Sequence, residues 1–210
     1  MNELKLNIGL DPATSVYLVG HSLGAQTSSV AGRWGQKTFG WKVGRITGLD
    51  PAGPFFYLFG NFLQAGDAAF VDIIHTSAFR VEADAGLGRL GYPTPTADLD
   101  FFPNGGTDQP NCELAPGEVP DPAAPSCMHQ SALWFYDATL NATSDRCSFP
   151  AYPADNYNAF LKTVEGGNLK STTSDTVMGY WANTEARGAR YLLTGKHFPY
   201  CLTGEEEVEE

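Results

Sequence analysis

The sequence lacks any apolar run of the roughly 18 residues that a membrane-spanning helix needs, so no transmembrane anchor is predicted. It also lacks an excess of positive charge, because 13 lysines and arginines stand against 24 aspartates and glutamates. Five of those acidic residues are the glutamates near the C-terminus, and residues 203–210 are therefore predicted to be an acidic, disordered tail. The remaining charge is still acidic, which argues against nucleic acid as a partner and against electrostatic docking on anionic lipid.

Cysteines are few, and none follows the C-x-x-C spacing typical of zinc sites, so no metal is predicted from them. Four cysteines allow three disulfide pairings.

The first five residues form neither the charged nor the apolar region of a signal peptide. Asn141 begins an N-x-T sequon, which is a glycosylation site only in a secreted protein. The even cysteine count and the sequon favour a location outside the cell. The lack of a signal-peptide pattern favours a location inside it, and composition alone leaves both open.

The most informative stretch is 16–24, VYLVGHSLG, in which a β-branched and aromatic run predicts a buried strand. The G-x-S-x-G sequence then puts Ser22 on a tight turn, and the residues from Ala25 onward predict a helix. Such a turn strains the serine backbone, so the residues two before and two after the serine must be small, as Gly20 and Gly24 are. It also exposes the serine hydroxyl to a substrate, with the first helical amides beside it. A serine that only caps the helix is the alternative interpretation.

Further apolar runs predict more strands, and the order of the elements predicts the fold class. The predicted strands are 43–49, 70–75, 99–102 and 189–193, and an amphipathic helix is predicted over 129–141. Strands alternating with helices in a chain of 210 residues indicate one α/β domain with a mostly parallel sheet. In such sheets reactive groups gather at the carboxyl ends of the strands.

A serine hydroxyl becomes a good nucleophile only when a base removes its proton, and histidine is the usual base. The chain has four histidines. His21 adjoins the serine and is expected to pack or hydrogen-bond beneath the turn. His75 ends a buried strand and is interpreted as a core histidine, and His197 has no acid nearby in the sequence. His129 follows a proline-rich loop and begins a helix, which suits an anchored base.

The base must in turn be held by an acid, and Asp50 is the better candidate for that role. It follows a predicted strand and is flanked by Pro51 and Pro54, which stop the strand. A turn-forming Asp-Pro pair is the alternative interpretation. The order Ser22, Asp50, His129 is the order in which α/β hydrolases carry their triad.

Several long blocks in register resemble the animal pancreatic-type lipase family, which includes triacylglycerol lipases and phospholipases A1. The resemblance implies an α/β-hydrolase fold for residues 1–202 and hydrolysis of a lipid carboxylic ester at a lipid–water interface. It implies Ser22 as nucleophile, Asp50 as acid and His129 as base, with the Leu23 amide donating to the oxyanion. The blocks are GHSLGA (20–25), ITGLDPAGPFF (46–56), DAAFVDIIHT (67–76), LDFFPNGGTDQPNC (99–112) and CMH (127–129).

The resemblance also implies a disulfide pairing and a cellular location. In the family, two cysteines bracket a lid over the site, which assigns a Cys112–Cys127 disulfide here and leaves Cys147–Cys201 by subtraction. It implies a secreted, extracellular protein. The lid segment 113–126 has few large apolar residues, so it resembles the phospholipase A1 branch more than a strict triglyceride lipase.

The chain departs from the family pattern in three places. Few residues precede Ser22, so we expect an incomplete lipase domain that lacks the N-terminal strands, leaves an exposed sheet edge and lacks the second oxyanion donor. No C-terminal colipase-docking module is expected. At the family's calcium loop Asp67 is kept but Gln64 stands where an aspartate is usual, so no calcium site is expected. The alternatives are a catalytically inactive lipid-binding or yolk-type storage relative and a non-lipase esterase.

Overall fold

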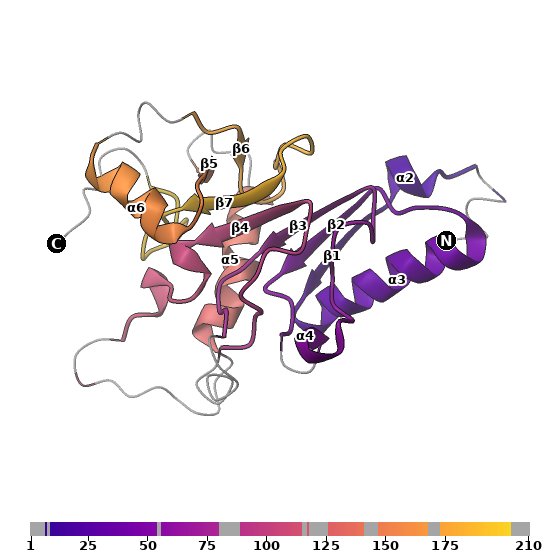
Figure 1. The fold of residues 1–210 in the computed structure, drawn as a ribbon, viewed down its shortest axis with the longest axis horizontal. Coiled ribbons are helices and arrows are strands. Elements are labelled where there is room, and N and C mark those ends of the chain that lie inside the picture. Colours follow the sequence, from indigo (N-terminus) through magenta and orange to yellow (C-terminus); the bar gives the residue numbers. More distant parts are fainter. Residues whose placement is uncertain are drawn as a thin grey trace.

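The computed structural model describes residues 7, 9–53, 56–79, 89–114, 117, 126–140, 147–167 and 173–202. This part of the chain forms a seven-stranded sheet in the order β1-β2-β3-β4-β7-β5-β6, flanked by helices (Figure 1). The first five strands of that order run parallel, and β5 pairs antiparallel with both β7 and β6. The predicted α/β fold is therefore confirmed.

The strands agree closely with the predicted apolar runs, and two of the helices do as well. The strands are β1 (Tyr17–His21), β2 (Arg45–Leu49), β3 (Phe70–Ile74), β4 (Leu99–Pro103), β5 (Pro150–Pro153), β6 (Thr176–Val177) and β7 (Gly188–Leu192). The helices are α2 (Pro12–Ser15), α3 (Leu23–Phe39), α4 (Phe56–Phe59), α5 (Cys127–Leu140) and α6 (Tyr157–Glu165), with short 3₁₀ turns η2 (Asn104–Gly106) and η3 (Pro110–Cys112). Sequence analysis did not anticipate β5, α6 and β6.

Helices α3 and α5 cover opposite faces of the sheet. Alternate residues of β3 belong to two separate hydrophobic clusters: Val71 and Ile73 to one, Phe70 and Ile74 to the other. The first cluster includes a residue of α3 and the second includes several residues of α5. Every residue of β3 and β4 is buried, which is why these central parallel strands are almost continuously apolar.

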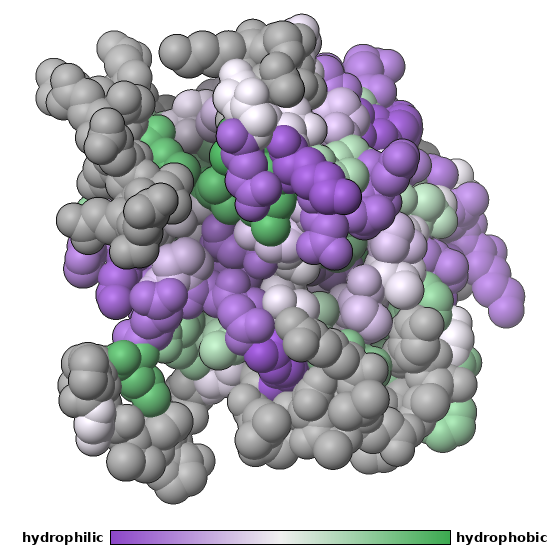
Figure 2. All heavy atoms as spheres, turned by 60° about the vertical axis from the view of Figure 1, so that its left-hand side comes forward, coloured by the Kyte–Doolittle hydropathy of each residue, from purple (hydrophilic) through white to green (hydrophobic). Residues whose placement is uncertain are grey.

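The two edge strands of the described sheet are β6 and β1, and β1 pairs only with β2. The Val19 side chain on β1 is 42% exposed. On the face shown in Figure 2, hydrophilic residues cover most of the described surface and hydrophobic ones lie in small groups. Among the described helices, none is long and apolar enough to cross a membrane.

Both disulfides that the family resemblance implied are present, Cys112–Cys127 and Cys147–Cys201. The first joins η3 to the first residue of α5. The glycosylation sequon at Asn141, the acidic tail at 203–210 and most of the lid segment 113–126 lie outside the described residues.

Candidate active site

Ser22 lies in the turn between β1 and α3, and its backbone is strained. Its φ and ψ are 56° and −120°, outside the regions that non-glycine residues favour. Its amide donates to the Leu49 carbonyl at 3.0 Å, which fixes the turn to the end of β2. A Cβ on Gly20 would lie 2.3 Å from the Gly24 carbonyl oxygen, so that glycine is required, whereas a Cβ on Gly24 would meet nothing within 4 Å. Glycine itself is therefore required at Gly20, whereas the small residue predicted at Gly24 could equally be alanine.

The Ser22 hydroxyl does not cap the helix that follows. Ser22 occupies the N-cap position of α3 but makes no side-chain capping hydrogen bond. The helix-capping interpretation is therefore wrong. Leu23 is the first residue of the 17-residue helix α3, so its amide is one of the donors that a helix leaves without an internal partner.

The structure brings Asp50 and His129 together although they are 79 positions apart in the sequence. The Nδ1 of His129 donates to Oδ2 of Asp50 at 2.6 Å, and both side chains are buried. Because a carboxylate only accepts, this bond assigns the imidazole proton to Nδ1 and the lone pair to Nε2. The Nε2 of His129 is buried, and among the described residues it has no hydrogen-bond partner, Ser22 included. A histidine in this tautomer can accept a proton at Nε2.

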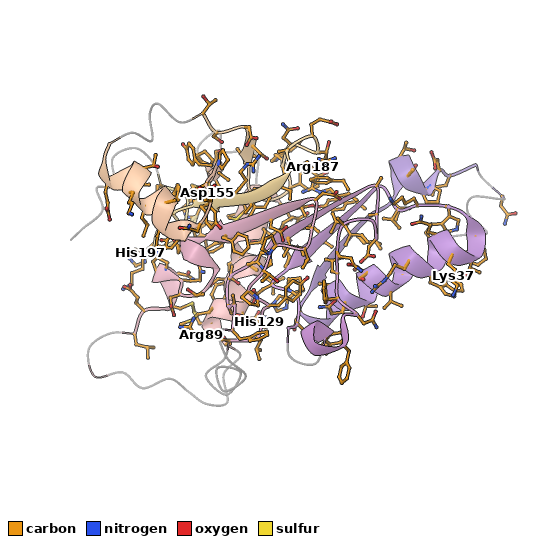
Figure 3. All side chains as sticks on the ribbon, in the orientation of Figure 1. Lys37, Arg89, His129, Asp155, Arg187 and His197 are labelled. Carbon is orange, nitrogen blue, oxygen red and sulfur yellow. A yellow bond between two sulfur atoms is a disulfide. The ribbon has the colours of Figure 1, made fainter. Side chains whose placement is uncertain are left out.

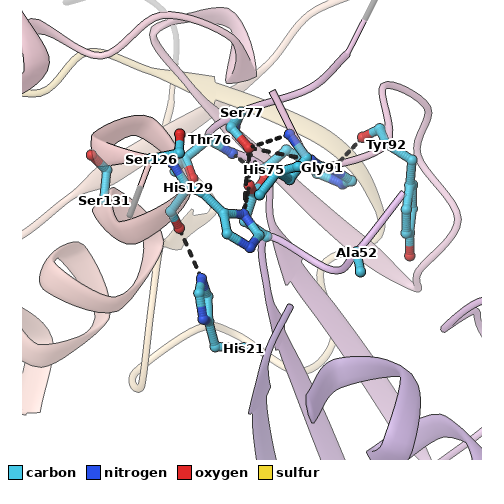
Figure 4. A network of polar contacts seen from close by, with 12 residues as sticks. His21, Ala52, His75, Thr76, Ser77, Gly91, Tyr92, Ser126, His129 and Ser131 are labelled. Atoms are coloured by element: carbon cyan, nitrogen blue, oxygen red, sulfur yellow. Dashed lines mark hydrogen bonds and ion pairs between the residues drawn. The ribbon is translucent and has the colours of Figure 1, made fainter. Parts of the chain in front are cut away.

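Asp50 is itself held by Thr76 and Ser77, which lie two and three residues beyond the end of β3 and are labelled in Figure 4. Its Oδ1 accepts from the backbone amides of Thr76 at 2.8 Å and Ser77 at 3.1 Å, and its Oδ2 accepts from the Ser77 hydroxyl. Gly91 lies directly against the carboxylate, since an added Cβ there would be 2.3 Å from Oδ1. Sequence analysis missed Ser77 and Gly91, and a serine after a strand and a glycine in an irregular segment give no distinct signal.

His21 packs and hydrogen-bonds as expected, and its partner is His129. Its Nε2 is 2.9 Å from the carbonyl oxygen of His129, and the centroids of the two imidazole rings are 4.4 Å apart. Since a carbonyl only accepts, Nε2 is the nitrogen of His21 that carries the proton. Burial lowers the pKa of His21, and it outweighs the hydrogen bond to the His129 carbonyl, which raises that pKa. His21, next to Ser22 in the sequence, is thus a neutral contact of His129 at neutral pH.

The other two histidines lie away from this arrangement. His75 is fully buried, with Nε2 2.8 Å from Oδ1 of Asp100 and Nδ1 3.1 Å from the Tyr92 carbonyl oxygen. Its interpretation as a core histidine is confirmed. His197 is exposed and lies well apart from His129 in Figure 3.

The Asp67 carboxylate is already occupied by groups of the chain. Its Oδ2 accepts from the Ser29 hydroxyl at 2.6 Å and from the Gln64 amide at 3.1 Å, and its Oδ1 is 3.5 Å from the Arg33 guanidinium. A guanidinium beside the carboxylate provides positive charge where a cation would otherwise lie. Among the described residues, no three His, Cys, Asp or Glu side chains form a group that could hold a metal ion. The surroundings of Asp67 do not fit calcium, which needs several oxygen ligands.

A strained serine, an aspartate and a histidine near the carboxyl ends of a mostly parallel sheet, in this chain order, are the arrangement of α/β hydrolases. The comparison with known families is more specific, because the model of the family described as Lipase matches residues 1–200. The chain belongs to the lipase family, which confirms the resemblance seen in its sequence.

Curated relatives share about a third of their aligned residues with this chain. Lipase member H of Oryctolagus cuniculus is 36% identical over 202 residues, which cover 89% of this chain and 40% of the relative. Lipase member H of Mus musculus is 38% identical over 203 residues, which cover 90% of this chain and 40% of the relative. Pancreatic lipase-related protein 3 of Homo sapiens is 35% identical over 210 residues, which cover 90% of this chain and 42% of the relative. The chain therefore spans about two-fifths of the length of the curated relatives it matches.

Proposed function

We propose that this chain carries the catalytic residues of a lipid ester hydrolase, with Ser22 as nucleophile, His129 as base and Asp50 as acid. The observation that carries the proposal is the 2.6 Å bond from His129 Nδ1 to Asp50, which leaves Nε2 buried and without a partner in the part of the chain that the structure describes. The uncapped hydroxyl of Ser22 on its strained turn supplies the group that such a base would deprotonate. Membership of the lipase family supports a lipid ester as the substrate class.

In the first half of this mechanism, Ser22 Oγ attacks the ester carbonyl carbon while His129 Nε2 takes the hydroxyl proton. The carbonyl π electrons move to oxygen, and the Leu23 amide donates to the resulting oxyanion. Asp50 stabilises the imidazolium without taking its proton. Loss of one oxyanion donor of this kind typically costs roughly a hundred- to a thousandfold in rate.

In the second half, the tetrahedral adduct collapses and expels the alcohol. The leaving oxygen takes the proton from His129, and the acyl group remains on Ser22. Water then attacks the acyl carbon with His129 Nε2 again as the base, and release of the fatty acid restores the serine. No step passes through a metal ion, because the residues around Asp67 do not fit one.

We further propose a phospholipase A1-like or weakly interface-dependent lipase that works outside the cell. The lid segment 113–126 has Leu114 and Val119 as its only large apolar residues, which gives little apolar face to a lipid surface. Leu114, at its start, is 49% exposed. Two disulfides suit an oxidising compartment.

Labelling with a fluorophosphonate, which reacts with activated serines, tests the proposed nucleophile. We expect the purified, oxidised chain to be labelled at Ser22, with the adduct located by peptide mass spectrometry. Ser22→Ala should abolish labelling. Ser28→Ala should leave it unchanged, because Ser28 lies in the same helix and its hydroxyl donates only to the Gly24 carbonyl at 3.0 Å. A folded chain that stays unlabelled, or labelling that persists in Ser22→Ala, would overturn the proposal and favour an inactive lipid-binding relative.

A further inference from the structure

We propose that Ser77 is a positioning residue of the active site, whose hydroxyl orients the Asp50 carboxylate toward His129. The inference rests on the proposed function, in which Asp50 is the acid that holds the base. Ser77 lies three residues after the end of β3, whereas Asp50 directly follows β2 and His129 is the third residue of α5. Three separate segments therefore meet at one hydroxyl group.

The hydrogen bonds around the Ser77 hydroxyl determine where its proton goes. The oxygen accepts from the backbone amides of Leu90 at 3.1 Å and Gly91 at 3.2 Å, and the Gly91 amide is shared with the Ser77 carbonyl oxygen at 3.1 Å. A serine hydroxyl has two acceptor lone pairs and one donor, so these two amides occupy both lone pairs. The single proton is left for Oδ2 of Asp50, which is the partner seen in the structure. Because Ser77 and Asp50 are both fully buried, water does not offer the hydroxyl another arrangement.

The same bond completes the coordination of the carboxylate. A carboxylate has about four lone-pair sites, and Asp50 accepts four hydrogen bonds. The amides of Thr76 and Ser77 bind Oδ1, while the Ser77 hydroxyl and the imidazole of His129 bind Oδ2. With every site filled, the carboxylate has one orientation, and Oδ2 faces Nδ1 of His129. Ser77 Oγ itself lies only 3.4 Å from that nitrogen.

Ser77 also determines how much negative charge the base experiences. A proton donated to Oδ2 withdraws electron density from the oxygen that stabilises the imidazolium. Without that donor the carboxylate would stabilise protonated His129 more strongly, although it would be held less firmly. A positioning role therefore predicts two changes in Ser77→Ala: a slower reaction, and an acidic limb of the pH–rate profile that moves to higher pH. A purely structural role predicts only a loss of stability.

The experiment compares Ser77→Ala with Ser29→Ala, which is matched in chemistry and differs in place. Ser29 is a fully buried serine whose hydroxyl donates to the buried Asp67 carboxylate at 2.6 Å, outside the proposed site. We expect Ser77→Ala to lower kcat on a soluble p-nitrophenyl ester by about tenfold to a hundredfold, with KM little changed. The midpoint of the acidic limb of kcat/KM should move to higher pH. Ser29→Ala should keep the wild-type rate and profile.

A spectroscopic measurement tests the inference without relying on activity. The proton between His129 and Asp50 is expected to give a low-field signal in the ¹H NMR spectrum, which should move in Ser77→Ala and stay in place in Ser29→Ala. Ser77→Thr keeps a hydroxyl and should keep the wild-type signal and pH profile, with thermal unfolding checking that each variant folds. An unchanged signal and profile in Ser77→Ala, or a change of the same size in Ser77→Thr, would overturn the inference. Failure of the proposed function would instead be seen as a Ser22→Ala variant that still reacts.

Discussion

Replacing Asp50 by asparagine should disable the base while leaving most of its contacts intact. The amides of Thr76 and Ser77 both donate to the Oδ1 position, so the asparagine oxygen is expected to take that position and its NH₂ group the Oδ2 position. That NH₂ group then donates a hydrogen bond to Nδ1 of His129, whereas the Asp50 carboxylate accepted one from this nitrogen. The imidazole proton moves to Nε2, and the nitrogen that should accept the proton of Ser22 is already protonated.

A wrong tautomer of this kind lowers kcat by about 10⁴-fold in a serine hydrolase triad. That factor corresponds to about 5 kcal/mol of lost transition-state stabilisation. The loss should be seen both in hydrolysis of a soluble p-nitrophenyl ester and in the rate of fluorophosphonate labelling. Because asparagine keeps the two backbone hydrogen bonds at Oδ1, the circular dichroism spectrum of the variant should remain that of the wild-type chain.

Asp67→Asn is the matched control, since Asp67 is also a buried aspartate bound by a serine hydroxyl and a backbone amide. Its kcat/KM should stay within about twofold of wild type, because the partners found for its carboxylate among the described residues are Ser29, Gln64 and Arg33 and not His129. A folded Asp50→Asn variant that loses less than about tenfold would refute the reasoning, because the tautomer of His129 would then not depend on Asp50.

Two further predictions concern the serine turn and the neighbouring histidine. Gly20→Ala should prevent folding of the turn and abolish fluorophosphonate labelling of Ser22, whereas Gly24→Ala should be labelled normally. Equal labelling of the two variants would contradict the contacts found for their Cβ positions. Burial lowers the pKa of His21 below its ordinary 6.5, so the unfolded chain takes up that proton first as the pH falls. The stability that neutral His21 contributes is therefore fully present above about pH 6.5 and is lost as the pH falls toward the lowered folded-state pKa. Urea unfolding should show this loss in wild type and a smaller one in His21→Gln, and identical pH slopes would argue against it.

The strands and the strained turn at Ser22 could be predicted because they depend on local patterns. Central parallel strands are buried on both faces, so a run such as 70–74, which is apolar except for Asp72, can be recognised as a strand from its composition. The G-x-S-x-G turn is equally local, and its strained serine follows from the spacing alone. The position of Asp50 could be anticipated because the prolines that follow it end its strand.

The missed features depend on contacts between distant segments or on weak local signals. Strand β5 begins and ends with proline and pairs antiparallel at the far side of the sheet, which gives no apolar run. Helix α6 has only nine residues, although Asn156 caps it by accepting from the Ala159 amide at 3.0 Å and could have identified its start. The role of Ser77 arises only when β2, β3 and the Leu90–Gly91 segment come together, which no single stretch of sequence records.

The parallel sheet also affects how quickly this site can form. His21 hydrogen-bonds to a residue 108 positions away, and Asp50 to one 79 positions away, so the residues around Ser22 are joined by contacts of long range. Folds dominated by such pairings fold slowly, because large chain loops must close before any contact compensates for the lost entropy. Helix α3 can form early, but the Asp50–His129 pair needs the central strands and α5 in place. After dilution from denaturant, fluorophosphonate labelling at Ser22 should therefore return later than the helical circular dichroism signal. The rate at which this labelling returns then reports when the whole sheet is complete.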